Sequence, residues 1–345
     1  MSSNPQQKAL FLESKQGQLV LGTREIHKPG PGELLVKVLA TSLNPVDWKI
    51  QKYGVFLDNF PAVLGTDVAG EVEQVGEGVT EFSKGDRVFC QGTFENEGAS
   101  FQQYTLTTAA TTAKIPSNLS FDAVSTIPVA LTAAYVGLYH YGPYGLELAS
   151  PLDPSNRGKY AGNPLVVLGG SSSVGQYAIQ LAKASGFSPI ITTSSLKHAD
   201  YLKSLGATEV IDRHTPLSGL AAEIKKVTDL PIRYVFDAIS TKETQQAGHD
   251  LLTSGGHLVV TLNPNLAKSD DINVVQVLGI LRLPQNFVLL KDMYSRLTAS
   301  LEEGVIQPNR YEVLPHGLEG IIEGLQRLQN DEISGLKLVA RPHDS

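Results

Sequence analysis

Small residues with a phosphate-binding spacing stand in the middle of the chain. Gly170, Ser172 and Gly175 fill the glycine positions of G-x-G-x-x-G, with serine in the middle position. An apolar run at 165–168 precedes them, and apolar residues at helical spacing follow. A strand, a tight turn and a helix start would bring free N–H groups and the positive end of a helix dipole together. We therefore expect dinucleotide phosphates to bind at Gly170, Ser171, Ser172, Ser173 and Val174. The alternative is an ordinary turn between a strand and a helix.

The end of the next expected strand bears on which dinucleotide binds. NAD-binding domains of this kind place Asp or Glu there, on the ribose 2′-hydroxyl. Here the strand is followed by Ser194, Ser195 and Lys197, with no carboxylate before Asp200. Two hydroxyls and a lysine suit a 2′-phosphate, so we expect NADPH as the cofactor. The serines can also begin a helix, with Lys197 in its solvated first turn, and both interpretations can hold together.

Alternating strands and helices must position this turn. From residue 165 onward the pattern indicates an α/β fold with a doubly wound parallel sheet, which binds ligands at the carboxyl ends of its strands. We expect strands at 165–168, 190–193, 209–211, 234–236 and 258–262, and helices near 174–185, 197–204, 217–228 and 242–253.

The N-terminal third has a different pattern. Turn signals separate candidate strands, which favours a small, strongly curved sheet. These strands are expected at 8–12, 19–23, 34–42, 67–75, 87–89 and 101–106. Pro128 breaks or kinks a helical segment at 121–138, and residues 139–164 are predicted to form a surface loop.

The C-terminal part begins with an apolar segment at 277–284. We expect this segment to line a substrate pocket or to form an edge strand used for dimerisation, and the alternative is a simple core strand. Helices are expected near 291–303 and 317–329, and a last strand at 336–341 should return to the N-terminal domain. The chain is accordingly expected to be a monomer or a homodimer.

Bulk properties exclude several classes of function. The net charge of −7 and the lack of a dense Lys/Arg cluster argue against nucleic acid or a membrane surface as partner. We find no secretory signal and no apolar run of the ~20 residues that a membrane span needs. Cys90 is the single cysteine, so an internal disulfide is impossible, and a cytoplasmic location is expected. The eight histidines show no close metal-binding pair.

Motifs over nearly the whole chain resemble the medium-chain dehydrogenase/reductase superfamily. Their order and spacing together are specific, although each alone is weak. They are SLNPVDWK at 42–49, LGTDVAG at 64–70, GDRV at 85–88, LTAA at 131–134, the unit at 165–186, LGA at 205–207 with ID at 211–212, and KLV at 337–339.

Within this superfamily the chain is similar to the zinc-free branch. That branch holds quinone reductases and the toxD-like, trans-acting enoyl reductases of fungal polyketide pathways. Zinc-dependent members place a cysteine where this chain has residues 44–47, and G-H-E where it has Gly65-Thr66-Asp67. The resemblance therefore implies no metal site. It also implies a GroES-like, partly open β-barrel domain at 1–125, completed by 290–345, and a Rossmann NADPH-binding domain at 126–289.

The resemblance further implies which residues meet the cofactor. The nicotinamide end would be lined by Val46, Asp47, Trp48, Lys49, Thr132, Leu262, Asn263, Lys337 and Leu338. Arg213 stands where similar enoyl reductases often carry an aromatic residue near the adenine. It would stack on that ring or pair with the 2′-phosphate, or it is an exposed arginine without a role.

Asn44, Lys49 and Tyr53 are the catalytic candidates. Asn44 and Thr132 would hydrogen-bond the ribose or the carboxamide, although Asn44 can equally be a turn residue before Pro45. Related mitochondrial enoyl reductases carry a tyrosine near Tyr53, which makes it the first candidate for proton donor. Phe56 fits the same alignment, and the other sources of a proton are Tyr135, Tyr139, Tyr141 and water.

A hydride donor without zinc suits a conjugated acceptor. Hydride reaches the β-carbon, charge collects on an enolate oxygen, and a proton reaches the α-carbon. We expect an oxidoreductase that reduces enones or enoyl compounds with NADPH. The alternatives are a quinone reductase and a non-catalytic NADPH-binding structural or redox-sensing protein. A polyketide synthase as partner stays open.

Overall fold

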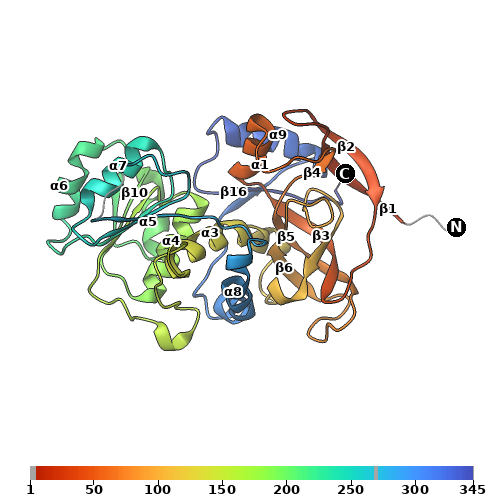
Figure 1. Ribbon diagram of the computed structural model, residues 1–345, viewed down its shortest axis with the longest axis horizontal. Coiled ribbons are helices and arrows are strands. Elements are labelled where there is room, and N and C mark those ends of the chain that lie inside the picture. Colours follow the sequence, from red (N-terminus) through yellow and green to blue (C-terminus); the bar gives the residue numbers. More distant parts are fainter. Residues whose placement is uncertain (1–4, 268–270, 345) are drawn as a thin grey trace. The chain divides into compact units, whose positions relative to one another are not determined.

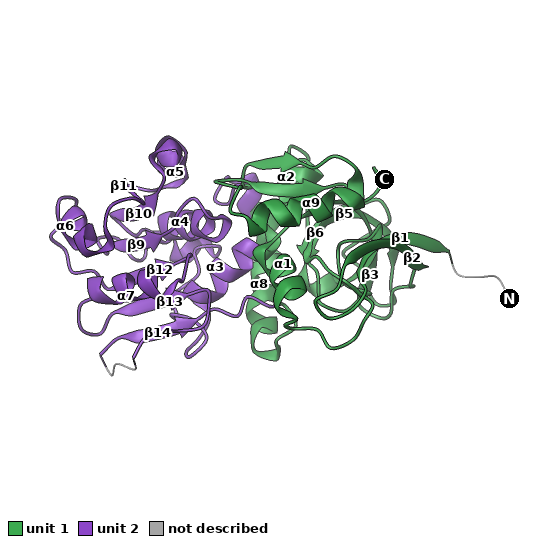
Figure 2. Ribbon diagram, turned by 90° about the horizontal axis from the view of Figure 1, so that it is seen from above, with its two compact units in different colours: residues 1–129, 281–299, 308–345 green, residues 130–280, 300–307 purple. Residues whose placement is uncertain are grey.

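The computed structural model describes residues 5–267 and 271–344, which form two compact units (Figure 2). Unit 1 comprises residues 1–129, 281–299 and 308–345, and unit 2 comprises residues 130–280 and 300–307. The C-terminal bounds differ from the expected ones. The second segment of unit 1 begins at Leu281 and not at residue 290, and residues 300–307 belong to unit 2.

Unit 2 is built on a parallel sheet whose order is β11-β10-β9-β12-β13-β14 in the described residues; Figure 2 labels these strands, and Figure 1 labels the helices of the unit. Its strands are β9 (Leu165–Leu168), β10 (Ile190–Ser194), β11 (Glu209–Asp212), β12 (Tyr234–Asp237), β13 (His257–Val260) and β14 (Asn273–Gln276). Successive strands run outward from β9 in both directions, which confirms the doubly wound parallel sheet. The order reverses at β9, so a ligand is expected at the carboxyl end of this strand.

Helices connect the strands of unit 2. They are α3 (Pro128–Tyr139), which starts at the boundary with unit 1, α4 (Ser173–Ser185), α5 (Ala199–Leu205), α6 (Leu220–Lys225) and α7 (Lys242–Leu251). Ser172 caps the start of α4, and Gly186, with a φ of 91°, ends it in the left-handed conformation. Residues 139–164 lack long regular elements, as expected, but Leu146, Leu148 and Leu152 are buried, so the segment packs rather than lying loosely on the surface.

Unit 1 is built on mainly antiparallel strands, with one parallel pair, Tyr311–Val313 with Lys337–Ala340, among the described residues. The strands are β1 (Gln6–Leu12), β2 (Leu19–Glu25), β3 (Glu33–Ser42), β4 (Ala62–Val63), β5 (Asp67–Val75), β6 (Arg87–Gln91), β7 (Tyr104–Thr108), β8 (Thr112–Lys114), β15 (Tyr311–Val313) and β16 (Lys337–Ala340). One described sheet has the order β2-β1-β4, and the other runs β15-β16-β3-β5-β6-β8 with β7 also paired to β3. A Cβ at Gly70 would lie 1.9 Å from the Lys37 carbonyl oxygen, so this close approach of β5 to β3 requires glycine.

The helices of unit 1 cover its sheets. They are α1 (Pro45–Tyr53), α2 (Phe121–Ser125) and α9 (Gly317–Gln329), together with most of α8 (Pro284–Glu302). Strand β16 pairs with the end of β3 through Val339 and Ser42, which confirms that the C-terminal strand joins the N-terminal domain. Neither a core strand nor an edge strand forms at 277–284, because β14 ends at Gln276 and α8 starts at Pro284.

Across the described residues, the helices are either too short or too polar to cross a membrane.

Candidate active site

The turn after β9 has the geometry of a phosphate-binding site. Ser172 Oγ accepts a hydrogen bond from Gly175 N at 3.0 Å, whereas the N–H groups of Ser173 and Val174 have no partner within the helix. A Cβ at Gly170 would lie 2.0 Å from Thr192 Oγ1, and one at Gly175 would lie 2.3 Å from the Gly169 carbonyl oxygen. The chain must therefore keep glycine at both positions to make this turn, and the turn fits a dinucleotide phosphate.

The carboxyl ends of β10 and β11 bring the predicted ribose-phosphate residues together. Arg213 N donates to the Ser194 carbonyl at 2.8 Å, so Arg213 lies beside the end of β10. The Ser194 side chain is buried and donates to the Ser195 carbonyl at 3.2 Å, whereas Lys197 and Arg213 are exposed. Asp212, the neighbour of Ser194 in the sheet, accepts a hydrogen bond from His214 N within its own turn. Two exposed cations and a half-buried Ser195 thus stand at this edge.

Three further residues of unit 2 were expected at the nicotinamide. Thr132 is fully buried in α3, and its hydroxyl has no hydrogen-bond partner among the described residues. Leu262 and Asn263 follow β13 and are exposed, and Asn263 Oδ1 accepts from Gln276 Nε2 at 2.7 Å. The orphaned hydroxyl of Thr132 is the feature that a bound group would satisfy.

Unit 1 contains a buried polar cluster formed by Ser42, Asn44, Asp47, Asp67 and Lys337. One oxygen of Asp67, Oδ2, lies 2.5 Å from Lys337 Nζ, 2.8 Å from Asn44 Nδ2 and 2.6 Å from Ser42 Oγ. Lys337 Nζ also donates to Asn44 Oδ1 at 2.8 Å. Asp67 Oδ1 accepts from Val129 N. The Lys337 side chain is 3% exposed and that of Asp67 is fully buried, so this is a desolvated ion pair.

The start of α1 adds a second carboxyl group to this cluster. Asn44 is the N-cap of α1, and its N–H donates to Asp47 Oδ2 at 2.7 Å. Asp47 Oδ1 is buried and lacks a hydrogen-bond partner among residues 5–267 and 271–344. Burial raises the pKa of Asp47 to about 7, while the Asn44 N–H and the Lys337 charge lower it and the Asp67 charge raises it. Asp47 therefore carries a proton part of the time at neutral pH.

The remaining predicted residues of α1 are half-buried, except for the exposed Tyr53. Lys49 Nζ lies 5.6 Å from the ring centre of Trp48, and burial lowers the pKa of Lys49. Tyr53 is 55% exposed and its ring lies 5.9 Å from that of Trp48. Val46 is half-buried against the core of unit 1. Leu338 lies in that core, and its carbonyl accepts from Leu43 N.

Sequence reasoning missed Ser42 and Asp67 as members of the cluster. Asp67 lies in the motif LGTDVAG at 64–70, which was used only to show that the G-H-E of zinc-dependent members is replaced. Its partner Lys337 is 270 residues away, so no local spacing connects the two.

The residues present do not fit a catalytic zinc. Asn44 and Asp67 are both engaged by the ammonium of Lys337, which would repel a metal ion. Cys90 is buried in β6, where desolvation raises its thiol pKa to about 11, so it is a poor metal ligand. Within the part of the chain that the structure describes, no group of three His, Cys, Asp or Glu side chains is arranged to hold a metal.

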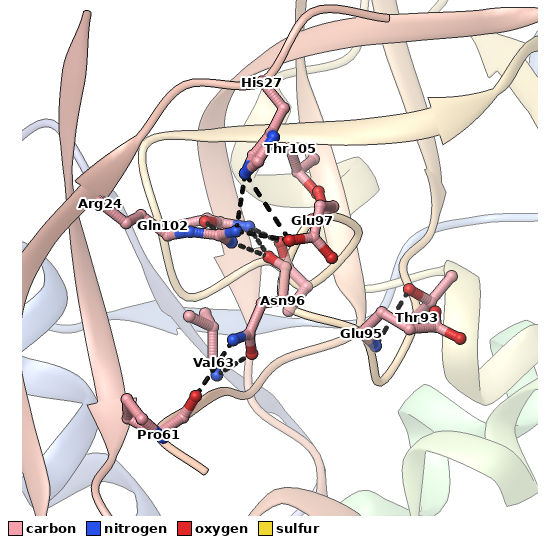
Figure 3. A network of polar contacts seen from close by, with 11 residues as sticks. Arg24, His27, Pro61, Val63, Thr93, Glu95, Asn96, Glu97, Gln102 and Thr105 are labelled. Carbon is pink, nitrogen blue, oxygen red and sulfur yellow. Dashed lines mark hydrogen bonds and ion pairs between the residues drawn. The ribbon is translucent and has the colours of Figure 1, made fainter. Parts of the chain in front are cut away.

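A polar network fixes the loop between β6 and β7 of unit 1 (Figure 3). The Arg24 guanidinium bonds the Asn96 carbonyl, the Gln102 side chain at 3.0 Å and Glu97 at 2.8 Å, and His27 lies beside it. This loop forms part of a cavity of about 320 Å³ in unit 1. Thr93, Thr107 and Phe287 line the cavity, and so do Leu281, Arg282 and Pro284 from the segment that was expected to line a pocket.

Comparison with known proteins identifies both units. Residues 30–117 match the alcohol dehydrogenase GroES-like domain, and residues 173–280 match the zinc-binding dehydrogenase family. The trans-enoyl reductase himH of Aspergillus japonicus is 32% identical over 352 residues, which cover 98% of each chain. The dehydrogenase pigH of Monascus ruber is 44% identical over 195 residues, which cover 53% of this chain and 51% of that protein.

Solved structures support the same fold. The quinone oxidoreductase from Coxiella burnetii superposes with a TM-score of 0.74 at 23% identity, covering 97% of this chain and 99% of that one. A Rossmann unit of this family implies a nicotinamide cofactor, and the turn after β9 fits one. The protein therefore belongs to the medium-chain dehydrogenase/reductase superfamily, as an oxidoreductase with a GroES-like unit and a nicotinamide-binding Rossmann unit.

Proposed function

We propose that the protein is an NADPH-dependent enoyl reductase that reduces C=C bonds conjugated to a carbonyl without zinc. The observation that carries this proposal is that the Lys337 ammonium donates hydrogen bonds to the side chains of Asn44 and Asp67. These two side chains are therefore not available as ligands of a metal ion. A site without a Lewis acid suits an acceptor that spreads its charge over a conjugated system. The similarity to a trans-enoyl reductase over nearly the full chain supports the same substrate class.

The residues of α1 would act on the substrate. A bound reduced nicotinamide supplies the hydride for the β-carbon. Asn44 donates a hydrogen bond to an oxygen of the bound reactants, and the ammonium of Lys49 offsets the negative charge that develops on the carbonyl oxygen. Tyr53 delivers the proton to the α-carbon, directly or through water.

The choice of NADPH rests on the edge formed by β10 and β11. Lys197 and Arg213 are exposed cations there, and Ser195 adds a hydroxyl. A phosphate on the ribose would gain both charges, whereas Asp212, a carboxylate at this edge, already accepts a hydrogen bond from His214 N. In unit 2, the buried hydroxyl of Thr132 would hydrogen-bond the carboxamide or the ribose.

The cavity in unit 1 is our candidate for the acyl part of the substrate. Its lining combines threonine hydroxyls with Leu281 and Phe287, which suits an acyl chain that carries oxygen atoms. A polyketide synthase as the source of such chains belongs to the same proposal, and so does a cytoplasmic location.

The experiment that tests the proposal is a titration with NADPH and NADH, read at the nicotinamide absorbance band. Enoyl thioesters, 2-enals and quinones are then added separately. We expect tighter binding of NADPH and its oxidation by enoyl thioesters or enals. Oxidation by quinones alone would make the protein a quinone reductase. Binding without oxidation by any acceptor would contradict the catalytic assignment and favour a nucleotide-binding protein.

A further inference from the structure

The amide of Asn44 is held at both ends by opposite charges. Its Nδ2 donates to Asp67 Oδ2 at 2.8 Å, and its Oδ1 accepts from Lys337 Nζ at 2.8 Å. A flipped amide would point its N–H groups at the ammonium and its oxygen at the carboxylate, turning two attractive contacts into repulsive ones. The orientation of Asn44 is therefore fixed, and it leaves the second N–H of Nδ2 for another acceptor.

The ion pair that fixes Asn44 is a poor device for stability alone. Lys337 and Asp67 are both desolvated, and a buried pair of this kind gains little over apolar residues of the same size. Moreover, Lys337 comes from β16, paired through Val339 with the end of β3, whereas Asn44 starts α1 directly after β3. The ion pair between Lys337 of β16 and Asp67 of β5 thus links two strands, and both of its side chains contact Asn44 at the start of α1.

We propose that Lys337 and Asp67 are positioning residues that lock the Asn44 amide, so that it presents one N–H as a fixed hydrogen-bond donor to an oxygen of the bound reactants. The expected effect on kcat rests on the proposed function. The fixed orientation of the Asn44 amide does not depend on that function.

The decisive variant removes both charges together. Lys337→Met or Asp67→Asn alone would leave one member of the ion pair buried and unpaired and can unfold the protein, whereas the double variant removes both members. Asp47 stays in the double variant, where it can hold a proton and so remain uncharged. In the double variant, Lys337→Met with Asp67→Asn, neither orientation of the Asn44 amide faces a charge of this pair, so the two orientations have similar free energies. We expect the double variant to keep the wild-type thermal midpoint within a few degrees and to lose about ten- to hundredfold in kcat. The matched control is Glu73→Gln with Lys84→Met, which removes an exposed ion pair of 2.6 Å from unit 1 and should leave kcat unchanged.

A second readout needs no turnover. The side-chain amide resonances of Asn44, assigned by their loss in Asn44→Ala, should show one proton shifted downfield by the carboxylate in the wild type. This shift should disappear in the double variant and persist in the control. A folded double variant with wild-type kcat would overturn the proposal, as would an unshifted amide in the wild type. If the wild type reduces no acceptor at all, the proposed function fails, and the amide resonances still decide whether Asn44 is locked.

Discussion

The glycine-rich turn of unit 2, which we propose as the phosphate site, and the buried polar cluster of unit 1 are built from different kinds of residues. The turn spans residues 169–175 and uses backbone N–H groups, hydroxyls and glycines, with no charged side chain. The cluster collects Asn44, Asp67 and Lys337 from three segments and balances charge against charge. A turn of this kind tolerates no added volume, whereas the ion pair in this cluster does not tolerate the loss of one partner alone.

The largest expected effect comes from adding one methyl group to the turn. Gly175→Ala would place Cβ 2.3 Å from the Gly169 carbonyl oxygen, a backbone atom that cannot move without opening the turn. We expect nucleotide affinity to fall at least a hundredfold, or about 3 kcal/mol, measured by titration with NADPH.

Gly219→Ala is the matched control for this change. Gly219 lies in the same unit at a φ of −94°, and the nearest atom to its Cβ position is 4.0 Å away. It should bind NADPH as the wild type does. Similar affinities of the two variants would show that the turn does not hold the phosphates.

Removing charge from the cluster should change how stability depends on pH. The pKa of Asp47 is raised from 3.8 to about 7, so between these values the folded chain holds a proton that the unfolded chain has lost. This contribution is fully present below about pH 4 and is lost as the pH rises through 7. Relative to the wild type, Asp47→Asn should therefore gain about 2–3 kcal/mol in unfolding free energy between pH 5 and pH 8.

Urea unfolding at both pH values measures this change. Asp58→Asn, at an exposed carboxylate beyond the end of α1, is the control and should follow the wild type. A constant difference between Asp47→Asn and the wild type across the range would mean that Asp47 ionises normally in the folded protein.

The same contrast explains what the sequence could predict. The strand at 165–168, the turn and α4 follow from local spacing, and so does the break at Pro128, because α2 ends at Ser125 and α3 starts at Pro128. The ion pair of the cluster could not be predicted from local spacing, because Lys337 reaches Asp67 only through the pairing of β16 with β3. For the segment 277–284 the two strand alternatives were wrong, because an apolar run has no period that separates a strand from a packed loop. Leu281 lines a cavity there before Pro284 starts α8.

A smaller effect would sharpen the account of unit 2. Lys197 is exposed, so its loss should not disturb the turn, but it would remove one charge from a 2′-phosphate. We expect Lys197→Ala to weaken NADPH binding about tenfold, or about 1.4 kcal/mol, with NADH unchanged. Lys203→Ala, on α5 and 3.4 Å from Glu209, should change neither. Equal losses for both nucleotides would mean that Lys197 does not read the 2′-phosphate.

The smallest expected effect tests the exposed side of α1. Tyr53 is 55% exposed, so water can replace its hydroxyl as the proton source, and Tyr53→Phe should lower kcat by less than about tenfold. Phe56 is 61% exposed and accepts a hydroxyl without a clash, which makes Tyr53→Phe with Phe56→Tyr the matching variant. Recovery of kcat in the double variant would show that a phenol hydroxyl at position 56 can replace that of Tyr53, whereas no recovery would tie the role to position 53. An unchanged kcat in Tyr53→Phe itself would remove this tyrosine from the mechanism and leave water as the donor, because a general acid that acts in the rate-limiting step cannot be deleted without cost.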